Sequence, residues 1–310
     1  MDHLEAPVHA YLNRRGRRVR SLDLRAEGHF STGRSAQSLR RISVVAHLVS
    51  GDVVEETLAL KHTSAAEVQA LSALADLAPD VPQLPELVAA GEDAAGPWVL
   101  LPMYEGRHPP HRLSPPPEVF DAVARVHSAW EGRTAGLTAI PTITPAWWRD
   151  LSLGYLRPNL ERTLERRPSA AIAAAIEAIT TTADDARITR ALELLPRTLV
   201  HGDLHEANIV VGERTTIIDW GSARAGPAML DVAEAAEQGS PGEARYLAER
   251  ERLDGRSPDP ALVLLGYRWA EVQITTQYLH YAGEVRSDAE LETMLETRSR
   301  ALRDLDGCLW

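Results

Sequence analysis

Two short segments near the middle of the chain decide how this sequence is interpreted. They are LVHGDLHEAN at residues 199–208 and IIDWG at residues 217–221. In each segment an apolar, strand-like stretch runs into polar residues, and side chains at the ends of buried strands are held stiffly. We expect Asp203, Asn208 and Asp219 to lie at one edge of these strands. Carboxylate and amide oxygens are hard ligands that suit Mg²⁺ better than Zn²⁺, so the pattern predicts a magnesium site.

The two histidines of the first segment allow another interpretation. His201 and His205 are four residues apart, a spacing that binds zinc when both side chains stand on one face of a helix. Gly202 lies between them and strand-like residues flank the segment, so a helix is not expected. We therefore expect His201 to be a structural hydrogen-bonding residue of the loop.

The basic residues of the chain are very unevenly divided between arginine and lysine. Of 33 basic residues, 32 are arginine, and Lys61 is the only lysine. Lysine is a compact point charge on a thin stem, whereas the guanidinium group is a wide planar fork. A narrow site that faces a phosphate would select for lysine, although a surface lysine kept by chance would give the same count.

Composition limits the class of protein. The chain has 310 residues, 44% of them hydrophobic, and a net charge of −11. This length predicts one large domain or two lobes, and the negative charge argues against nucleic acid as a partner. No apolar run approaches the roughly 20 residues that cross a bilayer, no secretory signal is recognised, and Cys308 is the only cysteine. We expect a soluble cytoplasmic protein, monomeric or homodimeric, that binds no membrane.

The first hundred residues have the pattern of β-strands. We expect five strands interrupted by one helix, which begins after Ser64 and ends near Leu77. Ser64 and Glu67 have the spacing of a capping box. The clearest strand segments are 22–30, 42–49, 53–61 and 98–101.

The rest of the chain has mainly helical periodicity. One strand pair, formed by 198–201 with 208–211, is expected to interrupt the helices. The expected helical segments are 119–130, 145–167, 169–195 and, with breaks near 239–242 and 255–260, 228–309.

The form H-G-D-x-H-x-x-N, followed by I-I-D-W, resembles the aminoglycoside phosphotransferase and choline kinase family. The family has a catalytic loop of the protein-kinase type. The resemblance implies an α+β, protein-kinase-like bilobal fold. Residues 1–103 would form a small, β-rich nucleotide-binding lobe with one helix, and residues 104–310 a larger, mostly helical catalytic and substrate-binding lobe.

The resemblance also implies roles for the residues of the two segments. Asp203 would accept the proton of a substrate hydroxyl group, and Asn208 and Asp219 would hold Mg²⁺ at the phosphates of ATP or GTP. Lys61 would contact those phosphates, oriented by Glu67. Glu67 has an equal claim to a purely structural role in the capping box with Ser64.

Further nucleotide contacts follow from the same resemblance. Pro102 and Tyr104 would offer a backbone carbonyl and N–H group to the purine, and proline is tolerated because only its carbonyl is needed. His205 is expected near the γ-phosphate. Ser35 belongs to a loop with a single glycine that would cover the phosphates, a departure from the glycine-rich loop of protein kinases that favours a small-molecule acceptor.

The acceptor is the least defined part of this expectation. An antibiotic is favoured, either an aminoglycoside or another sugar-bearing or nucleoside compound, which the enzyme would inactivate by O-phosphorylation. The alternatives are a metabolic kinase for choline, homoserine or a sugar, and a catalytically silent nucleotide-binding regulator. Glu234 and Glu237 are candidate contacts for cationic groups, and the candidate stacking residues are Trp147, Trp148, Trp269 and Tyr278.

Overall fold

The computed structural model describes residues 2–29 and 38–309, and the chain forms two compact units. The sheet unit combines residues 1–111 with 205–223, and the helical unit combines 112–204 with 224–310. The sequence-based division after residue 103 treated each part as one continuous stretch. The structure differs because the segment that follows Leu204 returns to the sheet unit.

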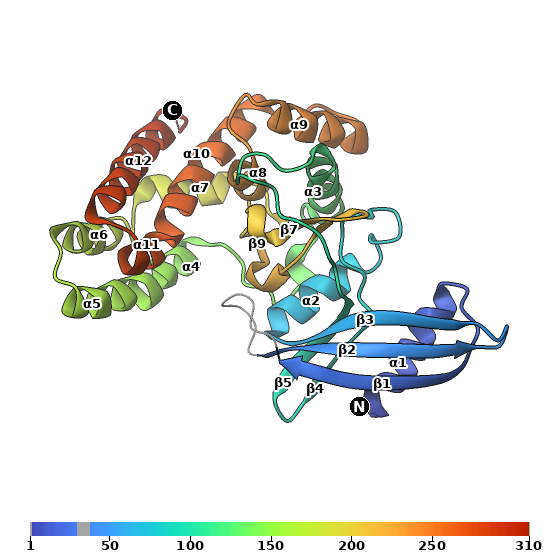
Figure 1. The fold of residues 1–310 in the computed structure, drawn as a ribbon. Coiled ribbons are helices and arrows are strands. Elements are labelled where there is room, and N and C mark those ends of the chain that lie inside the picture. Colours follow the sequence, from blue (N-terminus) through green and yellow to red (C-terminus); the bar gives the residue numbers. More distant parts are fainter. Residues whose placement is uncertain (1, 30–37, 310) are drawn as a thin grey trace. The chain divides into compact units, whose positions relative to one another are not determined.

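The sheet unit is built on antiparallel strands in the order β1-β2-β3-β5-β4 (Figure 1). Their bounds are β1 (Val19–His29), β2 (Ser38–Leu48), β3 (Val53–His62), β4 (Ala89–Asp93) and β5 (Gly96–Pro102). Gly51, with a φ of 95°, makes the turn between β2 and β3, as Gly does readily. Alternate residues of β2, among them Ile42 and Val44, are fully buried. One face of the sheet therefore forms the core of this unit.

An N-terminal helix, α1 (Asp2–Arg14), packs on that face and was not expected from the sequence. Its buried residues are Leu4, Val8, Tyr11 and Leu12, which share one cluster with Ile42, Trp98 and other residues of the sheet. Their spacing is helical. The signal was therefore present, but Pro7 lies inside the helix and obscures it. The helix expected after Ser64 is α2 (Ala65–Leu74).

The second stretch of the sheet unit carries a short hairpin of β7 (Ile209–Val211) and β8 (Thr215–Ile217). The Ile217 N–H donates to the Gln83 carbonyl at 2.8 Å, and Arg107 and Val211 exchange backbone hydrogen bonds. Gly212 allows the close approach: a Cβ atom there would lie 2.2 Å from the Glu105 carbonyl oxygen. These contacts tie the hairpin to the first stretch of the unit.

The expected pairing of 198–201 with 208–211 is wrong. β6 (Thr198–Val200) pairs with β9 (Arg224–Gly226) in the helical unit, whereas β7 pairs with β8. A three-residue turn lets β7 and β8 pair locally. β9 has only three residues and ends in glycine, so nothing in the local pattern marks it as the partner of β6.

The helical unit contains most of the helices of the described chain (Figure 1). Their bounds are α3 (Pro117–Trp130), α4 (Pro145–Arg149), α5 (Arg157–Arg166), α6 (Ala170–Thr181), α7 (Ala186–Leu194), α8 (Met229–Ala235), α9 (Pro241–Asp254), α10 (Pro260–Gln277), α11 (Leu279–Val285) and α12 (Asp288–Gly307). The expected helix 145–167 contains a π-helical segment (Asp150–Leu156), and 169–195 is divided where Asp185 caps α7. The breaks near 239–242 and 255–260 are confirmed.

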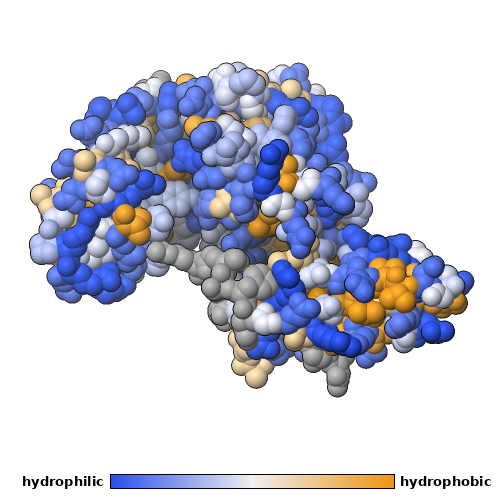
Figure 2. All heavy atoms as spheres, viewed as in Figure 1, coloured by the Kyte–Doolittle hydropathy of each residue, from blue (hydrophilic) through white to orange (hydrophobic). Residues whose placement is uncertain are grey.

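The surface seen in Figure 2 is mostly hydrophilic, with apolar side chains gathered over the strands β1 to β3. Val49 and Val53, beside the β2–β3 turn, are among the exposed apolar residues. None of the helices in the described part of the chain has the length and apolar character that crossing a membrane requires.

Candidate active site

Lys61 lies near the end of β3, where it pairs with Leu39 of β2 and Val99 of β5. Only 8% of the residue is exposed. Its Nζ atom lies 2.8 Å from Glu67 Oε1 and 2.7 Å from Asp219 Oδ1. The only lysine of the chain therefore stands between two carboxylates of the sheet unit.

These carboxylates also determine the protonation of Lys61. Burial alone would lower the pKa of Lys61, but the charges of Glu67 and Asp219 outweigh that effect and raise the pKa above its usual value. The ammonium group therefore stays charged at neutral pH, as a phosphate contact requires.

The side chain of Glu67 points to Lys61. The Ser64 hydroxyl caps α2 by accepting from the Glu67 N–H at 3.2 Å. The Glu67 carboxylate accepts from Lys61 and from the hydroxyl of Thr63. Both sequence-based roles of Glu67 are therefore partly present, since its N–H group belongs to the helix cap and its carboxylate to the ion pair. Thr63 was not identified from the sequence.

Asn208 and Asp219 stand at the same end of the β7–β8 hairpin. Ile209 pairs with Ile217, and beyond this pair the Ile218 N–H donates to the Asn208 carbonyl at 2.8 Å. Asn208 and Asp219 offer an amide oxygen and carboxylate oxygens, which are donors that Mg²⁺ prefers. The donor types therefore fit a magnesium ion that is also held by phosphates and water. Across residues 2–29 and 38–309, no group of three His, Cys, Asp or Glu side chains could hold a metal by itself.

Asp219 has an unusual backbone conformation. Its φ of 59° and ψ of 64° are left-handed, and within the described ranges it is the single non-glycine residue with positive φ. This conformation costs an ordinary residue about 1–2 kcal/mol, and such strain clusters at functional sites. The short helix of Trp220–Ser222 follows directly, and Trp220 is buried beside α2.

His205 begins the second stretch of the sheet unit. Its Nδ1 atom accepts from the Ala207 N–H at 3.2 Å and caps the short helix Glu206–Asn208. Its Nε2 atom lies 3.4 Å from Asn208 Nδ2. His205 therefore supports the turn that presents Asn208.

The expected purine contacts lie where β5 ends. Pro102 is the last residue of β5 and pairs with Leu58, and the next N–H group, of Met103, donates to the Thr57 carbonyl at 2.9 Å. The Tyr104 hydroxyl accepts from the Glu86 N–H at 2.8 Å, which fixes this side chain. Ser35 lies outside the described residues.

In the helical unit, Asp203 lies on the loop that follows β6. Gly202, with a φ of 77°, turns the chain there. The buried carboxylate of Asp231, on α8, accepts from the N–H groups of His201 and Gly202 at 2.7 and 2.8 Å. Asp231 therefore fixes the backbone just before Asp203 rather than facing solvent.

Asp231 is itself held by a buried polar chain. His127 Nε2 lies 3.2 Å from Asp231 Oδ2, and His127 Nδ1 lies 3.0 Å from the Tyr246 hydroxyl, to which Arg250 donates. Burial would raise the pKa of Asp231, but the hydrogen bond from His127, its charge and that of His201, and the Gly202 N–H lower it. His127 is fully buried.

Asp203 has an aromatic hydrogen-bond partner. The Tyr278 hydroxyl donates to Asp203 Oδ1 and also lies 3.1 Å from Glu234 Oε1. Tyr278 follows α10, and Glu234 is a buried residue of α8. Tyr278 was expected as a stacking surface, but the structure gives it a polar contact with the loop of Asp203.

A family model for the phosphotransferase enzyme family matches residues 54–264, which is more than half of the chain. The match includes Lys61, Asp203, Asn208 and Asp219. The chain belongs to the phosphotransferase enzyme family. It is therefore a small-molecule kinase of this family. No curated protein sequence matches the chain.

Several solved structures are similar to the chain. A choline kinase from Cryptosporidium parvum is 12% identical, with a TM-score of 0.58, and the match covers 92% of this chain and 90% of that one. A macrolide 2'-phosphotransferase from Brachybacterium faecium is 20% identical over 96% and 98% of the two chains, with a TM-score of 0.47. An aminoglycoside phosphotransferase from Alicyclobacillus acidocaldarius is 14% identical over 93% and 91%, with a TM-score of 0.48. The family match, together with the likeness to the choline kinase, confirms the predicted α+β, protein-kinase-like fold.

The remaining acceptor candidates of this phosphotransferase differ in exposure. Glu237, just after α8, is exposed, whereas Glu234 is 1% exposed and Trp269 is fully buried in α10. Trp148 is also buried and donates to the Thr182 carbonyl. Trp147 is half-buried, with the guanidinium carbon of Arg224 5.1 Å from its ring centre. Arg224 was not identified from the sequence.

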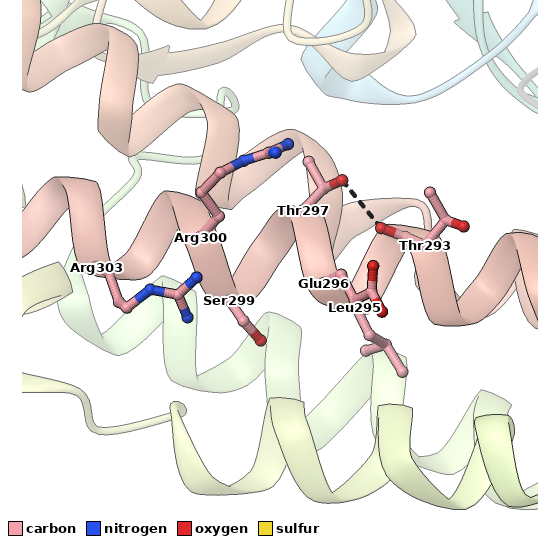
Figure 3. A pocket seen from close by; sticks show the side chains of 7 residues that line it. All are labelled: Thr293, Leu295, Glu296, Thr297, Ser299, Arg300 and Arg303. Atoms are coloured by element: carbon pink, nitrogen blue, oxygen red, sulfur yellow. Dashed lines mark hydrogen bonds between the residues drawn. The ribbon is translucent and has the colours of Figure 1, made fainter.

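A surface hollow lies along α12 of the phosphotransferase (Figure 3). It contains none of the predicted site residues. Its lining comes from one helix, in which Thr297 donates back to the Thr293 carbonyl. The hollow is lined by Thr293, Leu295, Glu296, Thr297, Ser299, Arg300 and Arg303.

Proposed function

We propose that this phosphotransferase moves the γ-phosphoryl group of ATP or GTP to a hydroxyl group of a small molecule. The observation that carries this proposal is the buried Lys61, held between Glu67 and Asp219. A lysine fixed in this way presents a compact positive charge to a phosphate. It also explains why this one position does not carry arginine.

The nucleotide half of the reaction would use the sheet unit. Lys61 would bind the α- and β-phosphates, and the end of β5 at Pro102 and Tyr104 would receive the purine. Asn208 and Asp219 would hold Mg²⁺, which neutralises charge that develops between the β- and γ-phosphates. His205 would keep Asn208 in place through the turn that it caps.

The acceptor half would use the helical unit. Asp203 would align the acceptor hydroxyl and take its proton as the new oxygen–phosphorus bond forms and the bond to the leaving nucleoside diphosphate breaks. Asp231 supports this role, because two hydrogen bonds from the loop backbone fix the chain beside Asp203. Such alignment supplies much of the catalysis in phosphoryl transfer, where the protein does little covalent work.

We propose an antibiotic as the acceptor, an aminoglycoside or another sugar-bearing or nucleoside compound that is inactivated by O-phosphorylation. The exposed Glu237 is available for a cationic group of such a compound. Choline is a second candidate, favoured by the ring of Trp147. A quaternary ammonium group binds aromatic faces, and Trp147 is half-buried; choline would have to displace Arg224, whose guanidinium carbon lies over this ring.

The test is Mg²⁺-dependent release of ADP or GDP with a panel of sugar-bearing antibiotics, nucleoside antibiotics, choline, homoserine and small sugars. Asp203→Ala should abolish acceptor-dependent release while nucleotide still binds, and Asp184→Ala is the control because Asp184 forms only an exposed ion pair with Arg149. If choline alone stimulates release, choline rather than an antibiotic is the acceptor. Nucleotide binding without release for any acceptor would favour a silent regulator, and phosphorylation by the Asp203→Ala enzyme would contradict the role of Asp203.

A further inference from the structure

Three oxygen atoms in the helical unit form a chain that ends at Asp203. The Tyr278 hydroxyl donates to Asp203 Oδ1, and its oxygen lies 3.1 Å from Glu234 Oε1. A tyrosine hydroxyl has one hydrogen. If this hydrogen is given to Asp203, the contact between Tyr278 and Glu234 needs a hydrogen from Glu234.

The neighbours of Glu234 fix the direction of these bonds. Arg224 donates to Gln277 Oε1 at 3.1 Å, and arginine has no acceptor, so the atom of Gln277 that it meets is the oxygen. The amide nitrogen of Gln277 therefore faces Glu234 and donates to Oε1 at 2.8 Å. Gln277 therefore does not provide the hydrogen between Glu234 Oε1 and the Tyr278 oxygen, because its own hydrogen bond ends at Oε1.

The second oxygen of Glu234 gives an independent indication. Oε2 is buried and has no hydrogen-bond partner among the described residues. A carboxylate in this position would leave a charged oxygen unsolvated, which is costly. A protonated carboxyl group avoids that cost, because its charge is removed and its hydrogen can be given to Tyr278.

We propose that Glu234 is a neutral, protonated carboxyl group that positions the Tyr278 hydroxyl as a hydrogen-bond donor to Asp203. The hydrogen bonds then run in one direction, from Glu234 to Tyr278 and from Tyr278 to Asp203. Glu234 is a positioning residue, since it acts on Asp203 through Tyr278. This differs from the sequence-based expectation that Glu234 contacts a cationic group of the acceptor.

The charges around Glu234 agree with this assignment. Burial, followed by the negative charges of Asp203 and Asp231, raises the pKa of Glu234 to about 8, and these effects outweigh the opposing positive charge of Arg224. Gln273 and Gln277, which α10 contributes, are uncharged. The pKa of Tyr278 is raised well above its usual value, by burial and by Glu234 and Asp203, so its hydroxyl keeps its hydrogen.

A consequence for activity rests on the proposed role of Asp203. Below a pH of about 8, Glu234 is protonated and the Tyr278 hydroxyl donates its hydrogen to Asp203. Above it, Glu234 becomes a second carboxylate that competes for the same hydrogen and adds negative charge beside Asp203. Turnover should therefore decline in this pH range. A neutral side chain at position 234 should abolish this decline.

The first experiment needs neither acceptor nor nucleotide. The infrared band of protonated carboxyl groups is followed in the full-length protein from about pH 6 to about pH 10, together with the melting temperature. We expect one band that disappears with a midpoint near pH 8 and is absent in Glu234→Gln. The wild type should also lose stability relative to Glu234→Gln as the pH rises through this range, because the folded state holds a proton that the unfolded state releases at lower pH.

Glu237→Gln is the matched control for both measurements, since Glu237 is exposed and close in sequence to Glu234. It should leave the band and the pH dependence of the melting temperature as in the wild type. A wild-type protein without a protonated carboxyl band at pH 7, or with a band that Glu234→Gln retains, would overturn the proposal. This result would leave the kinase assignment intact, because it does not involve turnover.

The second experiment measures nucleoside diphosphate release with the best acceptor of the panel, or nucleotide hydrolysis if no acceptor is found. Glu234→Gln should lack the decline in kcat above pH 8 that the wild type shows, when each enzyme is compared with its own kcat at pH 7. Tyr278→Phe should also lack this decline, and its kcat should change more than its KM. A Glu234→Gln enzyme that loses at least about tenfold in kcat/KM at pH 7 would instead assign Glu234 a charged role.

Discussion

At the level of single side chains, Lys61 illustrates how a site selects one kind of cation. Its ammonium group has two carboxylate partners, Glu67 and Asp219, in a place where 8% of the residue is exposed. An arginine would bring a wider, planar group with five donors. The buried site fits an ammonium group, which has three donors on one nitrogen. Part of a guanidinium group would have no hydrogen-bond partner there.

Lys61→Arg should therefore lower kcat/KM by at least about tenfold, which corresponds to about 1.4 kcal/mol of transition-state stabilisation. Because arginine keeps the positive charge, the loss of activity measures the effect of side-chain shape. Arg252→Lys is the control, because Arg252 forms an exposed ion pair with Glu249 within α9. If the Lys61→Arg enzyme has unchanged turnover, the presence of a single lysine at this position is explained by chance.

Asp231 provides a second test at this scale. Asp231→Asn replaces an acceptor of three hydrogen bonds, from His127, His201 and Gly202, by a group with one acceptor oxygen. We expect a loss of about 2–4 kcal/mol in the free energy of unfolding at pH 7, measured with urea.

The pH dependence of this loss has a defined sign. The folded-state pKa of Asp231 is lowered, so its contribution is present above the unfolded pKa of an aspartate and is lost as the pH falls toward the folded value. The difference between wild type and Asp231→Asn should therefore shrink on acidification below about pH 4. A difference that grows with acid would contradict the ionised state of Asp231.

The sequence-based predictions for the site also concern single residues. Residue type and position after strand-like segments predicted Asp203, Asn208 and Asp219, and the resemblance to the family joined Lys61 to them. The contact of Tyr278 with Asp203 could not be predicted, since it joins residues 75 positions apart. Nothing in the local sequence indicates which helix end reaches the loop.

At the level of elements, the β7–β8 hairpin depends on two close backbone contacts. A Cβ atom on Gly106 would lie 2.5 Å from the Val211 carbonyl oxygen, and one on Gly212 would lie 2.2 Å from that of Glu105. Both distances are shorter than non-bonded atoms tolerate, and the backbone has little freedom to move. The hairpin next to Asn208 and Asp219 is therefore fixed by two glycines that lie outside residues 199–208 and 217–221.

Gly212→Ala should destabilise the protein by about 2 kcal/mol or more and weaken nucleotide binding, because the hairpin must move away from residues 104–107. Urea unfolding and nucleotide titration measure the two effects. Gly28→Ala, in β1, is the matched control, since a Cβ atom there meets nothing within 4 Å. Equal stability of the two variants would argue against the close approach.

Element boundaries were predicted where local chemistry defines them. The Ser64 cap of α2 was recognisable, and so was the break between the strand segments 42–49 and 53–61. The pairing of β6 with β9 was not, because 23 residues lie between Val200 and its partner Arg224 and the partner strand has three residues. Pairing between distant short strands is decided by the surrounding fold rather than by the strand itself.

At the level of the whole molecule, nucleotide binding should be visible as stability. A ligand at about 100 times its Kd adds about 2.7 kcal/mol to the free energy of unfolding, which raises the melting temperature by roughly 5–10 °C for a chain of this class. Mg²⁺ with ATP or GTP should produce this shift, and chelation of Mg²⁺ should reduce it. Asp219→Asn should require more Mg²⁺ for the same shift, whereas Asp203→Ala should keep it; an unchanged Mg²⁺ requirement would count against Asp219 as a ligand.

The composition of the molecule gives Lys61 a practical meaning. A chain with one lysine has one side-chain amine, so an acylating reagent can modify only Lys61 and the amino terminus. Because Glu67 and Asp219 keep this amine protonated, and only a free amine is acylated, its rate of modification reports directly on those two carboxylates. Mass spectrometry of one peptide would thus follow the end of β3 proposed to bind phosphate in a crude mixture, without a mutation or a known acceptor.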